Sequence, residues 1–272
     1  MQASLRITLI TFFLGSILSI KAQNEWRGWG GAGLTLSLTK KLDLRLNHLR
    51  SYNLNSRVEN GFNQSSMSLN YDLTKRISVL GGYMLTAFPS GSESTSRGYT
   101  RLSYRMPIAK LINWSNGLQA EYHSTTETRF RYRFIYITRL SNKKEIPFMH
   151  LTLSASYWLY YNLGGNEIRY FDKSGAVLTR HSPDGFHRGR LYLNVATKVV
   201  KGLTFTIYYM KQTEFNLFSS EFRKMNVVNP TTGKTSRSFD SYNVAGLGLL
   251  YDINLYSSKK TKGRSHSSTI KN

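Results

Sequence analysis

Residues 128–140 read TRFRYRFIYITRL. Arginine occupies positions 129, 131, 133 and 139, while Phe130, Tyr132, Phe134, Tyr136 and Leu140 fall on the alternate positions. Successive side chains of a β-strand point to opposite faces, whereas a helix would spread both sets around its surface. The stretch therefore predicts a strand with one aromatic face and one row of guanidinium groups.

The same alternation recurs along the chain, and no segment shows a sustained helical period. Short polar turns and longer Ser-, Asn- and Gly-rich connections separate the alternating segments. The longest connections, 163–185 and 215–238, are each expected to hold a small hairpin. Eleven segments are expected, at 26–38, 41–49, 66–73, 77–88, 97–106, 114–123, 128–140, 149–161, 189–198, 203–210 and 243–253.

These segments are longer than the strands of soluble proteins, which average about five or six residues. A tilted strand needs about 9–11 residues to cross a bilayer. Short turns that alternate with long loops are typical of an outer-membrane barrel, in which the apolar face meets lipid and the polar face lines the interior. The sequence predicts an all-β fold, a single antiparallel transmembrane β-barrel of about 10–12 strands. Aromatic residues near segment ends are expected to form its interfacial girdles: Trp26, Trp29, Tyr71, Trp114, Trp158, Tyr160 and Tyr161.

The two ends of the chain differ in character from the region between them. Arg6 followed by an apolar run and Ala22 predicts a signal peptide over residues 1–22. Residues 257–272 are basic and predicted to be a disordered tail. The barrel is expected over residues 23–256, without disulfides because the chain has no cysteine. We expect export to the bacterial outer membrane.

The chain carries a formal net charge of +22. Nucleic acid is the usual partner of such a charge, but export and the even spread of arginine among aromatic residues argue against it. A water-filled lumen can hold these charges, whereas unpaired charges in a dry core cost several kcal/mol each. We expect Glu121 to pair across strands with Arg101, Arg105 or Arg131. The expected basic lumen residues are Arg45, Arg97, Arg101, Arg105, Arg129, Arg131, Arg133 and Arg190, and the acidic ones are Asp43, Glu121, Glu214 and Asp252.

The last segment contains GLLYDI, a glycine followed by alternating large residues. This resembles the pattern by which outer-membrane barrels present their final strand to the barrel assembly machinery. The order of segments resembles the DUF2490 family, uncharacterised outer-membrane barrels of Bacteroidota. The stretches that carry the resemblance are LTKKLDLRLNHLR, LNYDLTKRISVLGGY, NGLQAEYH, RFRYRF, GRLYLNV and GLTFTIYYMKQ. The resemblance implies the fold and an outer-membrane location, and it implies no chemistry.

The clearest enzymatic candidate is NWSNGLQAEYH at 113–123. Outer-membrane phospholipase A carries its nucleophile in an H-x-S-N-G arrangement, but here Asn113 stands in place of the histidine. Ser115 therefore lacks a base, and His123 lies roughly 26 Å away along a strand. Ser115 also falls in the lumen phase. We predict no catalytic residue, no metal site and no cofactor.

The sequence favours a non-enzymatic barrel with an Arg-rich lumen, either a narrow anion-preferring channel or a structural scaffold. One alternative is a lipid-acting outer-membrane enzyme, and another is an exported soluble β-protein that binds polyanions. The expected partners are outer-membrane lipid and lipopolysaccharide, the barrel assembly machinery and small anions.

Overall fold

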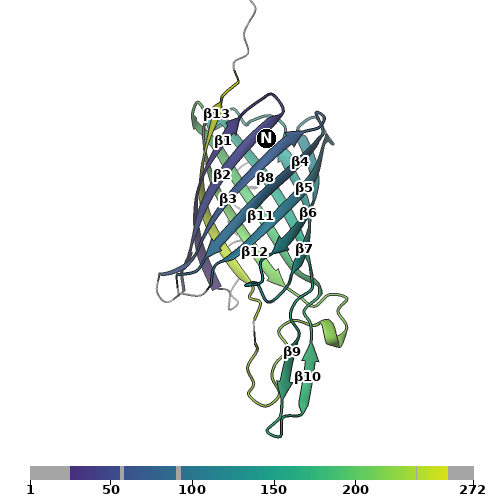
Figure 1. Cartoon of the computed structure of the whole chain (residues 1–272). Helices are drawn as coiled ribbons and strands as arrows, with labels where there is room; N and C mark the ends of the chain where they lie inside the picture. Colours follow the sequence, from purple (N-terminus) through teal and green to yellow (C-terminus); the bar gives the residue numbers. More distant parts are fainter. Residues whose placement is uncertain (1–24, 56–57, 90–92, 237, 257–272) are drawn as a thin grey trace, which may run out of the picture.

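The computed structural model describes residues 25–55, 58–89, 93–236 and 238–256. The expected signal peptide and basic tail lie outside the described residues. Each of the eleven expected segments is a strand of one closed barrel (Figure 1). The barrel strands are β1 (Glu25–Ser37), β2 (Leu42–Asn53), β3 (Glu59–Asp72), β4 (Ile77–Ala87), β5 (Thr95–Pro107), β6 (Ile112–His123), β7 (Tyr132–Asn142), β8 (Leu151–Leu163), β11 (Gly185–Val200), β12 (Leu203–Glu214) and β13 (Tyr242–Asn254).

Closure of the barrel pairs β1 with β13 in parallel, in register from Glu25 and Tyr242 onward. Every other neighbouring pair in the barrel is antiparallel. When strands alternate in direction around a ring, an odd number forces the first and last to run the same way. The expected barrel is thus confirmed, with eleven strands and one parallel seam.

The two ends of the barrel have connections of different length (Figure 1). Residues 38–41, 73–76, 108–111, 143–150 and 201–202 form the short-turn end, and the second-to-last of these contains the short helix η1 (Phe148–His150). The loop end carries the described residues 54–55 and 58, 88–89 and 93–94, 124–131, 164–184, and 215–236 with 238–241. The expected hairpin in the fourth loop is β9 (Ile168–Phe171) with β10 (Val177–His181), which projects away from the barrel, as Figure 1 shows. The fifth loop holds η2 (Glu221–Arg223) and a single bridge between Val228 and Thr235.

Strand β7 shows how the alternation is realised. Tyr132 and Phe134 point outward and are 45% and 41% exposed, whereas Arg133 points inward and is 7% exposed. The expectation that Phe130 faces lipid is wrong, because its side chain is 2% exposed and packs inside. The reason is that β7 begins only at Tyr132, so Phe130 belongs to a loop that turns its ring into the barrel.

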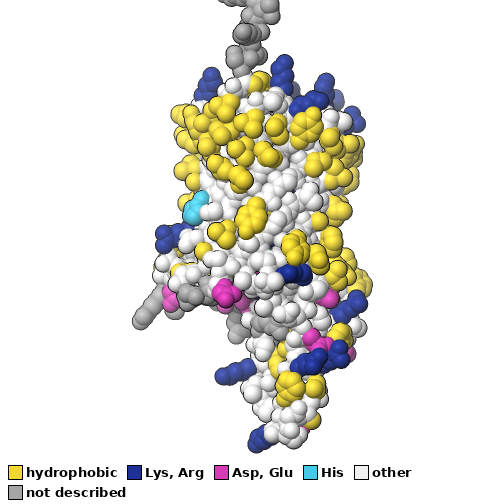
Figure 2. Space-filling view, in the orientation of Figure 1, with side chains coloured by type: hydrophobic (Ala, Val, Ile, Leu, Met, Phe, Trp, Pro, Cys, Tyr) yellow, Lys and Arg dark blue, Asp and Glu magenta, His cyan; other side chains and the backbone are white. Residues whose placement is uncertain are grey.

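The outer wall carries the apolar belt that a membrane barrel requires. Figure 2 shows hydrophobic side chains gathered on the wall toward the short-turn end, with lysine and arginine along the rim. Exposed rim residues include Lys40, Lys75 and Lys110. In the described part of the chain, no helix has the length and apolarity needed to span a bilayer. Outward residues of the belt include Leu46, Met67, Leu69, Tyr83, Leu102, Leu118, Tyr136, Leu153, Ile207 and Leu249.

Three of the aromatic residues expected in the girdles point inward instead. Trp29 and Tyr160 are buried, and Trp158 packs beside Tyr160. Trp29 packs against Met210, Tyr242 and Val244. Aromatic residues are common on either face of a strand, so only their phase within the strand separates a lipid-facing ring from an interior one.

Candidate functional site: a lumen in two parts

The lumen has an open half toward the short-turn end. A cavity of about 650 Å³ lies there, lined by strands from β2 round to β12 and by the β3–β4 turn. Its polar lining comes from the inward phase of each strand, as the alternation predicts. The basic lining residues are Arg45, Lys75, Arg76, Arg101, Arg105 and Arg139, and the acidic ones are Asp43 and Asp72.

The arginines of this half have no carboxylate partner. Within the described ranges, no carboxylate lies within 4.0 Å of the guanidinium groups of Arg45, Arg101, Arg105 or Arg139. Arg101 instead donates to Gln119 Oε1, with Nε at 2.7 Å, and its Cζ lies 5.4 Å from the centroid of the Trp158 ring. Arg139 donates to Ser154 Oγ at 3.1 Å. Arg101 and Arg139 are therefore held in place by neutral groups, and none of the four guanidinium groups has a carboxylate of the described ranges at contact distance.

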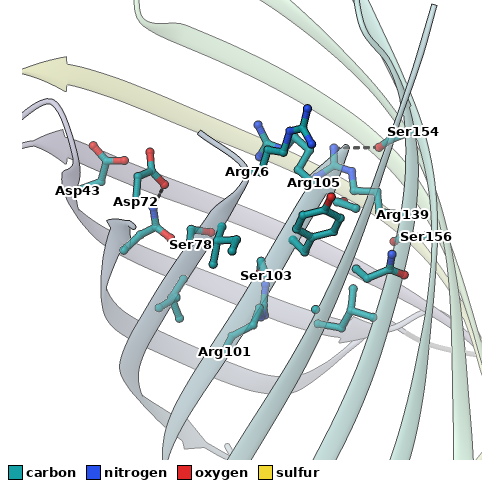
Figure 3. A pocket seen from close by; sticks show the side chains of 18 of the residues that line it. Asp43, Asp72, Arg76, Ser78, Arg101, Ser103, Arg105, Arg139, Ser154 and Ser156 are labelled. Carbon is teal, nitrogen blue, oxygen red and sulfur yellow. Dashed lines mark hydrogen bonds between the residues drawn. The ribbon is translucent and has the colours of Figure 1, made fainter. Parts of the chain in front are cut away.

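The carboxylates of the cavity stand apart from three of its arginines, Arg76, Arg105 and Arg139. In Figure 3, Asp43 and Asp72 lie toward one side, while Arg76, Arg105 and Arg139 lie together on the other. The backbone N–H of Arg105 donates to the carbonyl of Arg76, which fixes these two residues beside each other. This separation leaves a positive wall on β5 and β7 (Figure 3).

Ser115 lies within this positive wall. Its Cα partners are Arg105 on β5 and Arg139 on β7. Its hydroxyl faces the lumen rather than the lipid, and it lines the cavity. His123 is buried and bonded to Glu121 Oε2 at 3.0 Å. His123 is therefore held by Glu121 and does not serve Ser115 as a base.

The half toward the loop end is centred on Glu121, which is 6% exposed. Its Oε2 accepts from His123, and Arg97 Nε and Arg133 Nη1 lie 3.6 and 3.7 Å from the same oxygen. Gln119 Nε2 donates to Oε1 at 2.6 Å. The expected pairing of Glu121 with Arg101, Arg105 or Arg131 is wrong, because the register places Arg133 directly opposite Glu121.

Aromatic rings and amides accommodate the remaining buried arginines of this half. Arg133 Nε donates to Asn162 Oδ1 at 3.2 Å, and its Cζ lies 3.7 Å from the Phe130 centroid. Arg190 Nε donates to Gln212 Oε1 at 2.7 Å, and its Cζ lies 5.3 Å from the Tyr160 centroid. These contacts extend from β7 to β12, so the layer spans one side of the barrel.

Arg188 and Glu214 form a buried ion pair at the loop end of the same layer, between directly paired residues of β11 and β12. The sequence places Glu214 in the lumen phase but gives no sign of its partner, because Arg188 follows a bulge between Phe186 and Arg188.

A cluster of loop side chains lies at the loop end of the lumen. Phe130, Met225 and Phe239 are buried against one another. Arg129 Cζ lies 5.3 Å from the Phe239 centroid, and its Nε and Nη2 donate to the two oxygens of Glu127 at 3.0 and 2.9 Å. Burial raises the pKa of Glu127, but the hydrogen bonds and charge of Arg129 outweigh this effect and lower the pKa to about 2. We call Phe130, Met225 and Phe239 the loop plug.

One of the residues expected in the lumen lies elsewhere. Arg131 Cζ lies 5.0 Å from the centroid of Tyr122, whose ring is on the outer face. Asp252 falls on the inward phase of β13, opposite the buried Thr35, but it is exposed near the end of the strand and outside the lining of the cavity. Conversely, the alternation did not single out three residues that contribute to the lumen. Asp72 lines the cavity, Gln119 donates a hydrogen bond to Glu121, and Glu127 binds Arg129. Among the described residues, no cluster of His, Asp or Glu could hold a metal ion.

A family model described as "Protein of unknown function (DUF2490)" matches residues 26–220. The chain belongs to the DUF2490 family. This match covers the barrel from β1 through β12, so the resemblance found in the sequence is confirmed. No curated protein matches the chain.

Two solved structures share a distant likeness with this DUF2490 protein. One is described as "NanC porin structure in rhombohedral crystal form", with 12% identity, a TM-score of 0.45, and coverage of 85% of this chain and 100% of that chain. The other is a crystal structure of a double variant of OccD1 (OprD), with 12% identity, a TM-score of 0.30, and coverage of 69% of this chain and 50% of that chain. Likenesses this distant carry no inference about activity.

Proposed function

We propose that this protein is a non-enzymatic barrel of the bacterial outer membrane that admits small anions into a basic lumen and conducts them. The apolar belt, the basic rim and the layout of loops support a membrane location with the long loops outside and the short turns in the periplasm. In this orientation the open half of the lumen is a vestibule that faces the periplasm.

The observation that carries the proposal is the set of uncompensated guanidinium groups in the cavity. Arg45, Arg101, Arg105 and Arg139 line it, and no carboxylate of the described chain pairs with them. Rings of arginine or lysine favour anions in pores, and a narrow space with low-dielectric walls concentrates the field. An anion that enters the vestibule gains charge-assisted hydrogen bonds, whereas a cation is repelled.

The loop plug and the layer centred on Glu121 lie across the route from the vestibule to the outside. Every arginine of that layer named above already has a polar or aromatic partner, so it offers a passing ion less attraction than the vestibule does. The layer is therefore the narrow part of the conducting path and the vestibule is its selectivity region.

Planar-bilayer recording in a KCl gradient tests this proposal. The purified barrel should conduct with a reversal potential closer to the Nernst potential of chloride than to that of potassium. The double variant Arg105→Gln, Arg139→Gln should lower the permeability ratio of chloride to potassium by roughly twofold or more. Phe130→Ala should raise the single-channel conductance by opening the loop plug. The matched control is Phe134→Ala, which removes the same ring from the lipid face and should leave conductance unchanged.

Cation preference in the unaltered protein would overturn the anion assignment. Absence of conductance both in the unaltered protein and in Phe130→Ala would show that the barrel is a closed scaffold.

A further inference from the structure

The outer wall has a polar interruption on β2 and β3. On β2 the outward positions Leu42, Leu44 and Leu46 are apolar, and the next two are His48 and Arg50. Ser65 of β3 is the direct partner of His48, and its Oγ lies 2.9 Å from His48 Nδ1. Both His48 and Arg50 are exposed. Charged side chains are costly on the lipid face near the midplane and tolerated near the interface.

The opposite wall lacks this interruption. Strand β7 presents Tyr132, Phe134, Tyr136 and Leu140 outward along most of its length. The apolar run from Leu42 to Leu46 spans only about 13 Å along β2, against a belt about 25 Å tall in membrane barrels. The apolar belt therefore ends early over β2, and Figure 2 shows few hydrophobic side chains over the middle of this face.

A groove lies beside the interruption. Its volume is about 680 Å³, and its lining comes from β1 to β4, including His48 and Ser65. The small side chains of Ala32 and Ser65 leave room between larger neighbours. The apolar lining residues are Ala32, Leu34, Leu46, Met67, Tyr83 and Leu85.

The polar side chains at the end of the groove are His48 and Arg50. Each is anchored by a hydrogen bond within the protein, and Arg50 retains N–H donors that this bond does not use. Arg50 donates through Nη2 to Asn60 Oδ1 at 2.8 Å, and its Cζ lies 5.2 Å from the Tyr52 centroid. A guanidinium has five N–H donors, so this anchoring leaves others for a ligand. Outward neighbours on one strand are about 7 Å apart, close enough for His48 and Arg50 to contact one phosphate-bearing headgroup.

We propose that this groove binds one molecule of lipid A, the phosphorylated anchor of lipopolysaccharide, with an acyl chain along the groove and a phosphate against Arg50 and His48. Charge complementarity and the coincidence of the polar interruption with a groove support this occupant. The choice of lipid A over a glycerophospholipid rests on the proposed orientation. In that orientation the part of the apolar belt nearest the long loops contacts the outer leaflet, which is the leaflet that contains lipopolysaccharide. The site is separate from the lumen, since Arg50 and Arg45 lie on opposite faces of β2.

Native mass spectrometry of the delipidated barrel in detergent tests the site, with purified lipid A and phosphatidylglycerol as the probes. The unaltered protein should retain one lipid A in preference to phosphatidylglycerol. Arg50→Gln should weaken lipid A binding about tenfold, because charge-assisted hydrogen bonds are lost. The matched control is Arg45→Gln, which removes the same charge from the lumen face of the same strand and should bind lipid A normally.

A second pair of variants tests the groove itself. Ala32→Phe should block the acyl chain and weaken binding, whereas Ala120→Phe, at an outward alanine of β6, should not. Equal lipid A binding by Arg50→Gln, Ala32→Phe and the unaltered protein would overturn the site. Equal affinity for phosphatidylglycerol would overturn the choice of lipid A.

Bilayer recording separates this proposal from the proposed channel. Arg50→Gln should leave the reversal potential unchanged, and Arg45→Gln should shift it toward cations. If the barrel never conducts but Arg50→Gln still loses lipid A binding, the channel proposal is refuted and the lipid site is supported.

Discussion

The two halves of the lumen use the same residue, arginine, in opposite ways. Toward the loop end, Arg133 and Arg188 are buried, and each lies beside a carboxylate. Toward the short turns, Arg45 and Arg105 line an open cavity and pair with no carboxylate of the described chain. Arginines of the first kind hold the barrel together, and those of the second kind remain available to a ligand.

The difference follows from the cost of removing a charge from water. A buried guanidinium needs a carboxylate, amide or aromatic ring to offset its desolvation, and loss of one partner leaves an uncompensated charge. An arginine in a water-filled cavity has no such need. Pairing with a carboxylate therefore distinguishes the arginines that stabilise the fold from those left open to the cavity better than position in the sequence does.

The largest effect should come from Glu121→Gln. This change removes the only carboxylate among the contacts of Arg97 and Arg133 within the described chain. It should lower the free energy of unfolding by about 3 kcal/mol, measured by urea titration in detergent. Asp43→Asn, in the water-filled half, should cost less than about 1 kcal/mol. Equal costs for the two variants would abolish the distinction between the halves.

A smaller loss of stability is expected at low pH, when Glu127 beside the loop plug becomes protonated. Because the pKa of Glu127 is depressed to about 2 from an ordinary value of 4.5, its stabilising contribution is present above pH 4.5 and lost as the pH falls toward 2. The loss should be about 2 kcal/mol, with allowance for the part-exposed Arg129. Hydrogen exchange of residues 124–131 should show the opening.

The matched variant for this experiment is Glu127→Gln, which cannot titrate. The protection factors of its loop, which correct for the intrinsic pH dependence of amide exchange, should stay constant across that pH range. A loop that opens with the same pH profile in both proteins would place the titrating group elsewhere.

The smallest effect on stability should come from Arg105→Gln. Because Arg105 has no ion-pair partner among the described residues, its removal should change the free energy of unfolding by less than about 0.5 kcal/mol. The same urea titration checks this value. A cost near that of Glu121→Gln would mean that Arg105 is structural and would remove it from the selectivity region.

The sequence was sufficient to predict the strands and most of their faces. Tyr132, Phe134 and Arg133 lie where a period of two places them, since that period follows from backbone geometry within a single strand. It was not sufficient for Phe130, because loop conformation is not visible in local alternation. Trp29 was misplaced by its aromatic character, although its position is out of phase with Leu34 and Leu36 and so already favoured the interior. The hydrophobic pattern alone also left the strand number open.

By itself, the sequence determined that the chain alternates apolar and polar residues over membrane-crossing lengths and that its polar face is rich in arginine. The tertiary structure decided which arginines meet a carboxylate. That choice depends on the register between neighbouring strands and on loops folding into the barrel. Register places Arg133 opposite Glu121 and surrounds Ser115 with Arg105 and Arg139, and contacts between residues so far apart in the chain are set only when the barrel closes.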